Sequence, residues 1–324
     1  MTLRIGFIGV GGIAQHHMLQ LKEIPEAQIV LVYDVNREAA EQTAAGLGAR
    51  AAGSPDEVLD KSRVDAVYVC VPPFAREELE VTAARRGIPF FVEKPLGVDL
   101  ELVRRKAEVI RESGVLHAVG YVLRYYDTVQ MAKDYLQNKP YHLVQASRLG
   151  GSHPSKWWKQ LDLSGGNLVD AATHQVDLLR YVGGEFKEVF ASFGQTAIHQ
   201  LDPDATIYDS GSLSFTMQSG AVGSLTESCM STIHPGNEVR VYGSDFFLEL
   251  SGNGRTLLIK DAGGEQTWTS EKNAFLEQAR AFLQAVSSGS RELILCDYED
   301  GLKTLEFTLA ANRSGLERRV VELT

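Results

Sequence analysis

Apolar and polar residues follow two rhythms in the first 120 residues. Short apolar runs predict strands, and longer stretches with a helical repeat separate them. Strands that alternate with helices need crossover connections, so the strands run parallel in a sheet covered by helices on both faces. Residues 1–120 are therefore predicted to form an α/β domain with a doubly wound parallel sheet. The predicted strands are Leu3–Ile8, Gln28–Tyr33, Asp65–Val71, Ile88–Val92 and Val115–Val119, and the predicted helices are Gly12–Glu23, Arg37–Leu47, Glu77–Arg86 and Leu100–Arg111.

The pattern changes near residue 121, where strand candidates begin to follow one another with few helices between them. This order is typical of an antiparallel sheet, so residues 121–324 are predicted to form an α+β domain with a large, mostly antiparallel open sheet. Gln218-Ser219-Gly220 predicts a hairpin turn. The predicted strands are Tyr141–Ser147, Lys187–Phe193, Ser212–Met217, Ala221–Glu227, Glu238–Tyr242, Phe246–Leu250 and Thr256–Ile259. The predicted helices are Asp127–Gln137, one from Asn167 to Gly183-Gly184, Glu271–Ser287 and Tyr298–Asn312.

Composition narrows the class of protein. The net charge of −10 over 324 residues disfavours a broad surface for nucleic acid or anionic membranes, and leaves a small molecule as the expected partner. No apolar run approaches 18 residues and no signal sequence is apparent, so a cytoplasmic protein is expected. Three distant cysteines indicate neither a disulfide framework nor a zinc site. No metal is expected, and His16-His17 is interpreted as helix surface.

A glycine turn follows the first predicted strand. Gly9, Gly11 and Ala14 fit the pattern G-x-G-x-x-G/A, with Gly12 and Ile13 between Gly11 and Ala14, and all five residues are predicted to contact the cofactor. The first glycine allows a tight turn, the second lets the backbone approach a diphosphate, and the small third residue lets the helix pack close to the strand. The diphosphate then lies at the helix N-terminus, where N–H groups point at it. The sequence therefore predicts a dinucleotide-binding, Rossmann-type domain.

An acidic residue follows the second strand. Asp34 is placed to accept hydrogen bonds from the ribose hydroxyls of the cofactor and to repel a 2′-phosphate. An alternative is a turn or capping role for this aspartate before Asn36. Arg37 lies close by and would tolerate a 2′-phosphate. NAD is the predicted cofactor, and NADP remains possible, with Asn36 and Arg37 as further cofactor-side residues.

The fifth predicted strand ends in Glu93-Lys94-Pro95. Ligands of open parallel sheets bind outside the carboxyl ends of the strands, so Lys94 is placed where a nicotinamide and a substrate would meet. Glu93 and Pro72, which follows the fourth strand, are predicted to contact the cofactor. The alternative for Lys94 is an ordinary surface lysine in a loop.

Three motifs together resemble the glucose–fructose oxidoreductase and inositol dehydrogenase family, written Gfo/Idh/MocA. They are the glycine turn, Glu93-Lys94-Pro95 and the segment Gly165-Gly166-Asn167-Leu168-Val169-Asp170-Ala171-Ala172-Thr173-His174, and the similarity covers essentially the whole chain. The resemblance implies that Lys94 touches the substrate hydroxyl and the nicotinamide region, and that Asp170 and His174 complete the site, with His174 as general base. It also implies a homodimer or homotetramer. Arg76 departs from the family, which commonly has histidine near this position.

Helical spacing supports the second motif independently. On one continuous helix, Asp170, His174 and Asp177 would form a single polar stripe at i, i+4 and i+7. A neighbouring carboxylate would fix the tautomer of His174 as a base. An alternative for Asp170 is a purely structural residue near a helix start. Around this site, further substrate contacts are predicted at Tyr121, Arg124, His153, Trp157, Trp158 and Asp177.

The predicted function is hydride transfer between nicotinamide and a secondary alcohol of a polyol, a sugar or a related compound. Two alternatives remain open from the sequence: a dinucleotide-binding regulator without catalysis, and an enzyme that uses NAD transiently to cleave a glycoside. The apolar alternation at Leu213, Phe215 and Met217 is expected to pack against a second copy of the chain.

Overall fold

A computed structural model describes residues 2–323, and its contacts divide the chain into two units. The first unit runs through Val122 and takes in Asn273–Leu302, and the second comprises Leu123–Lys272 and the chain from Lys303 onward. Residues 1 and 324, the outer ends of the two predicted domains, lie outside the described residues.

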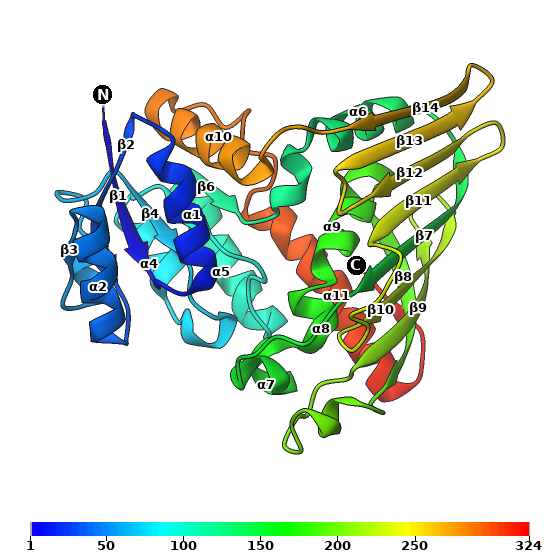
Figure 1. Ribbon diagram of the computed structural model, residues 1–324, viewed down its shortest axis with the longest axis horizontal. Helices are drawn as coiled ribbons and strands as arrows, with labels where there is room; N and C mark the ends of the chain where they lie inside the picture. The colour runs from blue at the N-terminus through cyan, green and yellow to red at the C-terminus, as the bar shows by residue number, and fades with distance from the viewer. Residues whose placement is uncertain (1, 324) are drawn as a thin grey trace. The chain divides into compact units, whose positions relative to one another are not determined.

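Six parallel strands form the sheet of the first unit, in the order β3-β2-β1-β4-β5-β6 (Figure 1). The predicted doubly wound parallel sheet is confirmed. The two-residue strand β3 has too short an apolar run to be predicted. The strands are β1 (Leu3–Ile8), β2 (Ala27–Tyr33), β3 (Arg50–Ala51), β4 (Ala66–Val69), β5 (Phe90–Val92) and β6 (His117–Val119). The helices are α1 (Gly12–Lys22), α2 (Arg37–Leu47), α3 (Pro55–Val58), α4 (Leu79–Arg85), α5 (Leu100–Ser113) and α10 (Ala274–Ser288).

Helix α10 packs against α1 although it lies more than 250 residues later in the chain (Figure 1). Its residues Ala279, Phe282 and Leu283 are buried with Met18 of α1 in one apolar cluster. The sequence assigns residues 273–302 to the second domain, whereas these contacts join them to the first unit. The helical repeat shows that α10 has an apolar face, but it does not say which sheet that face covers.

Nine strands form the sheet of the second unit, in the order β14-β13-β12-β11-β7-β10-β9-β8-β15 (Figure 1). All neighbours are antiparallel except β7 and β10. This confirms the predicted large, mostly antiparallel sheet and the hairpin between β9 and β10. Strands β14 and β15 were not predicted. The strands are β7 (Tyr141–Leu149), β8 (Phe186–Gly194), β9 (Ser210–Met217), β10 (Val222–Ser228), β11 (Glu238–Gly243), β12 (Phe247–Ser251), β13 (Thr256–Asp261), β14 (Gly264–Thr269) and β15 (Val321–Glu322).

Helices cover one face of this sheet and bury its apolar side chains. The helices are α6 (Asp127–Leu136), α7 (Leu161–Ser164), α8 (Gly166–Asp170), α9 (Thr173–Gly183) and α11 (Tyr298–Glu317), which the division after Leu302 shares between the units. Leu213, Phe215 and Met217 are buried in the core that α6, α9 and α11 form with the sheet. The expectation that these three residues face a second copy is therefore wrong, because the chain's own helices already cover them.

The helix predicted from Asn167 onward is two helices in the structure. The N–H groups of Ala171 and Ala172 both donate to the carbonyl of Asn167, at 2.9 Å each, so the regular i to i−4 pattern ends there. Helix α8 stops at Asp170 and α9 begins at Thr173. The prediction that Asp170, His174 and Asp177 form one stripe on a continuous helix is wrong for this reason.

Over the described part of the chain, none of the helices combines the length and apolar character needed to cross a membrane.

Candidate active site

The glycine turn leaves the start of α1 open. Gly9 has φ +92°, and a Cβ on it would lie 2.4 Å from the carbonyl oxygen of Cys70, so only glycine fits. A Cβ at Gly11 or Gly12 would meet nothing within 4 Å, and no side chain caps the helix. The backbone at this N-terminus therefore faces open space, which fits a cofactor diphosphate.

Ile13 and Ala14, the two residues after the glycines, differ in burial. Ala14 is completely buried, so its small side chain lets α1 lie close to the sheet, as the pattern predicts. Ile13 is 37% exposed. An exposed apolar side chain at the first turn of α1 fits the predicted contact with a cofactor.

Asp34 links the glycine turn to the start of α2. Its Oδ2 accepts from the N–H of Val10 at 2.9 Å, and its Oδ1 accepts from the N–H of Asn36 at 2.8 Å. Asn36 caps α2 through the N–H of Ala39. Arg37 is exposed and pairs with Glu41 at 2.7 Å. The carboxylate is thus oriented by backbone groups beside the turn, which fits a ribose contact.

Lys94 follows β5 at the same edge of the sheet as the glycine turn. The sheet order places β1 and β5 on either side of β4, and all three are parallel, so their carboxyl ends meet at one edge. Lys94 is partly exposed, and so is Pro72, which follows β4. The glycine turn, Pro72 and Lys94 therefore lie at one edge of this sheet.

The Glu93 side chain is only 5% exposed, and its Oε1 lies 2.7 Å from Nε2 of His17. The interpretation of His17 as helix surface is wrong, since it is 1% exposed. The partnership joins residues 76 positions apart, so no local pattern indicates it. Tyr121, predicted to contact substrate, is also 1% exposed in this unit.

In the second unit, Asp170 ends α8 and is held by an aromatic neighbour. The Nε1 of Trp158 donates to its Oδ2 at 2.7 Å. The ring of His153 lies 6.1 Å from the rings of both Trp157 and Trp158, measured between centroids. His153 is exposed, Trp157 is partly exposed and Trp158 is buried. Four predicted site residues therefore gather within this unit.

His174 lies in the first turn of α9 and is partly exposed. Two glycines start the preceding helix: Gly165 and Gly166 have φ +75° and +82°, and a Cβ on Gly165 would lie 2.6 Å from Val169. The motif spacing thus reflects a glycine-started helix, a break and a second helix, with Asp170 and His174 on either side of the break.

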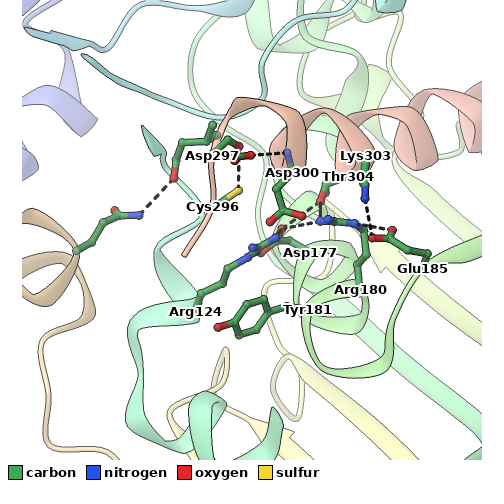
Figure 2. A network of polar contacts seen from close by, with 12 residues as sticks. Arg124, Asp177, Arg180, Tyr181, Glu185, Cys296, Asp297, Asp300, Lys303 and Thr304 are labelled. Atoms are coloured by element: carbon green, nitrogen blue, oxygen red, sulfur yellow. Dashed lines mark hydrogen bonds and ion pairs between the residues drawn. The ribbon is translucent and has the colours of Figure 1, made fainter. Parts of the chain in front are cut away.

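Arg124 and Asp177 form an internal ion pair, although the sequence predicts both as substrate contacts. Figure 2 shows the two side chains next to each other. Hydrogen bonds of 2.8 and 2.6 Å join them, and each side chain is 1% exposed. Oδ1 of Asp177 also accepts from Thr304 at 3.0 Å, and Arg180 lies 3.9 Å away. The Arg124 guanidinium lies over the ring of Tyr181, 4.5 Å from its centroid. These contacts fit a structural role.

Two charged residues that were not predicted as site residues, Glu227 and Arg148, lie near α8. Glu227 accepts a short hydrogen bond from Asn167 and is 3% exposed. Burial raises the pKa of Glu227 to about 7, against the opposing effects of the Asn167 hydrogen bond and the charge of Arg148. Burial likewise lowers the pKa of Arg148, which the charges of Glu227 and Asp170 counteract. Alternation along β7 and β10 marks these positions only as sheet residues, so no sequence signal identifies the cluster.

Within residues 2–323, no three His, Cys, Asp or Glu side chains gather as metal ligands. The cysteines Cys70, Cys229 and Cys296 are buried and form no disulfide in this part of the chain.

Two family models match most of the chain. An oxidoreductase family with an NAD-binding Rossmann fold matches residues 3–121, and the Gfo/Idh/MocA C-terminal domain matches residues 135–249. The chain belongs to the Gfo/Idh/MocA family. The resemblance inferred from the three motifs is confirmed. The prediction of an oxidoreductase is confirmed as well, and its first unit has the NAD-binding Rossmann fold of the family.

Relatives of this Gfo/Idh/MocA protein match it along its whole length. It is 28% identical to the myo-inositol 2-dehydrogenase of Thermotoga maritima, over 99% of this chain and 98% of that protein. It is 27% identical to the inositol 2-dehydrogenase of Rhizobium meliloti, over 100% of both chains. The crystal structure of a probable dehydrogenase from Thermotoga maritima superimposes with a TM-score of 0.84 at 27% identity, covering 99% of this chain and 98% of that one.

Proposed function

We propose that this chain is an NAD-dependent dehydrogenase that oxidises a secondary alcohol of a polyol, a sugar or a related compound. One observation carries the proposal: an open glycine turn and a partly exposed lysine lie at the same edge of one parallel sheet. The family membership and the relatives named as inositol dehydrogenases support the substrate class.

NAD, when bound, accepts the hydride that leaves the alcohol carbon. The residues proposed to hold it are those of the glycine turn, Asp34, Asn36, Arg37 and Pro72. Glu93 is left out of this set because its side chain is buried against His17. For Lys94 we propose a hydrogen bond to the alcohol oxygen, which stabilises the negative charge that develops there. For His174 we propose the role of general base that takes the alcohol proton, since a histidine titrates near neutral pH.

Asp170 is proposed to bind a substrate hydroxyl or to tune Lys94 electrostatically. Trp158, predicted as a substrate contact, is buried, and we assign it to orienting Asp170 through the hydrogen bond from its indole N–H to Oδ2. His153 and Trp157 are proposed substrate contacts on the same loop. Tyr121, Arg124 and Asp177, all nearly fully buried, are assigned to packing and internal pairing instead.

The test is a screen of polyols, aldoses and sugar acids, in which the absorbance of NADH measures its formation. At least one compound is expected to give ketone and NADH in equal amounts. Product formation at constant NADH would indicate transient use of NAD in glycoside cleavage. A chain that binds NADH but turns over no compound of the three classes would favour the regulator.

NAD is expected to bind at least about ten-fold more tightly than NADP, because the carboxylate of Asp34 repels a 2′-phosphate. Arg37 is engaged by Glu41, which leaves its guanidinium less suited to a phosphate. Fluorescence titration of both reduced cofactors measures the ratio, and Asp34→Ser is expected to reduce it. Tighter binding of NADPH by the wild-type chain would contradict the role of Asp34.

We also propose a homodimer or homotetramer that pairs through the helix-free face of the nine-stranded sheet. On this face Ser212, Ser214 and Thr226 present small side chains beside Phe190 and Val222, which are 42% and 53% exposed. A surface with exposed apolar side chains suits self-association. Light scattering is expected to return a mass of two or four chains, and Phe190→Glu should lower it. A wild-type mass of one chain rules this out.

The cytoplasm is the proposed location, consistent with three buried cysteines outside any disulfide.

A further inference from the structure

The carboxylate of Glu93, immediately before Lys94, is held by contacts with three other parts of the chain. Glu93 Oε1 lies 2.7 Å from Nε2 of His17, and Oε2 accepts from the N–H of Lys94 at 3.1 Å. A Cβ on Gly120 would lie 2.8 Å from both carboxylate oxygens, so the group also packs directly against that backbone. The Glu93 carboxylate therefore lies between His17, the backbone N–H of Lys94 and Gly120.

Glu93 is ionised in this setting. Burial raises the pKa of Glu93, but the hydrogen bond with His17 and the charges of His17, Lys94 and Arg76 outweigh it and hold the pKa below its ordinary value. A carboxylate only accepts hydrogen bonds, so Nε2 of His17 carries the hydrogen and donates it. A charged acceptor makes this a stronger bond than one between neutral groups.

Arg76, a buried cation, holds the segment that follows Lys94. Arg76 is 1% exposed, and it donates from Nε to the carbonyl of Val71 at 3.2 Å and from Nη1 to the carbonyl of Pro95. It thus bridges the loop after β4 and the residue immediately after Lys94. Among the described residues Arg76 has no ion-pair partner within salt-bridge distance, so its specific bonds go to backbone.

We propose that His17 and Arg76 are positioning residues that hold Lys94 from both sides, His17 through Glu93 and Arg76 through the Pro95 carbonyl. The inference rests on the proposed role of Lys94 in the dehydrogenase. A lysine side chain has many rotamers, and fixing the backbone on both sides limits the positions its ammonium group can reach. His17 lies on α1, which starts at the glycine turn, so one side chain couples that turn to the lysine.

His17→Leu and His17→Gln separate positioning from packing. The leucine removes the donor, and kcat is expected to fall by about ten- to a hundred-fold, because small misplacement of a reacting group is costly. The Kd for NADH is expected to change little, since the glycine turn and Asp34 are intact. Glutamine retains an N–H donor and is expected to restore most of kcat. His199→Leu, at an exposed position of the 3-10 helix Ile198–Gln200, is the matched control.

The pH profile gives a readout that a purely structural role would not move. Loss of the His17 hydrogen bond raises the pKa of Glu93, so Glu93 takes up a proton at a higher pH than in the wild type. The neutral acid no longer attracts the Lys94 ammonium. Protonation of the proposed base His174 already produces an acid limb of kcat, and protonation of Glu93 adds a second ionisation to it. The limb is therefore expected to become steeper in His17→Leu, and less so in His17→Gln. An unchanged limb together with near-normal kcat overturns the proposal for His17.

Hydrogen exchange tests the proposal independently of turnover. The Lys94 N–H donates to Glu93, so peptides that cover residues 93–97 are expected to exchange faster in His17→Leu and Arg76→Met than in wild type. Arg313→Met, at an exposed position of α11, is the control for arginine. If His17→Leu does not fold, His17→Phe replaces it, because phenylalanine keeps a ring but has no hydrogen-bond donor. If Arg76→Met does not fold, Arg76→Lys replaces it and is expected to exchange faster, because it loses the fork that bridges two carbonyls.

Unchanged exchange over residues 93–97 in folded variants of both residues overturns the proposal, whatever the enzyme oxidises. A wild-type chain that reduces no NAD would instead defeat the proposed function, while exchange would still decide whether the two residues hold the loop.

Discussion

Lys94→Ala and His174→Ala are each expected to reduce kcat by about two orders of magnitude or more while NADH binding survives. The first removes the proposed donor to the alcohol oxygen, and the second removes the proposed base, each of which is worth about a hundred-fold or more in comparable enzymes. The glycine turn and Asp34 remain in both variants, so the cofactor still has its binding groups. Steady-state kinetics with a substrate from the screen, and fluorescence titration with NADH, measure the two effects.

Matched controls separate chemistry from general damage. Lys61→Ala and His142→Ala change the same residue types at exposed positions, one in each unit, and are expected to keep wild-type turnover. Lys94→Arg keeps a positive charge in a different shape and is expected to recover only part of kcat. Near-normal turnover in Lys94→Ala or His174→Ala would refute the role assigned to that residue.

Asp177→Asn is expected to lower the free energy of unfolding of the chain by about 3–5 kcal/mol, because it leaves the buried Arg124 guanidinium without its countercharge. Both side chains are 1% exposed, and two hydrogen bonds join them (Figure 2). Urea denaturation followed by circular dichroism measures the loss. Asp162→Asn, at an exposed position of α7, is the control and is expected to change stability little.

The double variant Arg124→Met/Asp177→Leu sharpens this prediction. Replacing both charges removes the unpaired group, so the double variant is expected to be more stable than Asp177→Asn. Under permissive conditions, folded Asp177→Asn should retain a larger share of kcat than His174→Ala. A stability loss below about 1 kcal/mol, the range of exposed ion pairs, would instead return Asp177 to the list of substrate contacts.

Asp177 also shows where a helical repeat misleads. The spacing of 170, 174 and 177 is correct for one face of a helix, yet the chain breaks that helix at residues 171–172, where two N–H groups share the Asn167 carbonyl. The break separates Asp170 from the helix that carries His174 and Asp177. Asp177 is then buried against Arg124, 53 residues earlier in the chain.

Features that depend only on residues close together in the sequence could be predicted from the sequence alone. The glycine turn between a strand and a helix, the lysine at the end of β5, the alternation of strands and helices in the first unit and the hairpin in the second are all confirmed. Each rests on the period of apolar residues or on a backbone conformation that only glycine adopts easily, and both are encoded within a few consecutive positions.

Partnerships between distant residues were decided only by the tertiary structure. These are the buried contact of His17 with Glu93, the pairing of Arg124 with Asp177, and the return of α10 to the first sheet. The period of a helix shows that one face is apolar, but not what that face packs against. A charged residue shows that it needs a partner or water, but not which it finds. Both partners are determined by contacts between residues far apart in the sequence. A charged group is buried only where the fold brings a group of opposite charge or a hydrogen-bond partner to it, because its removal from water is otherwise too costly.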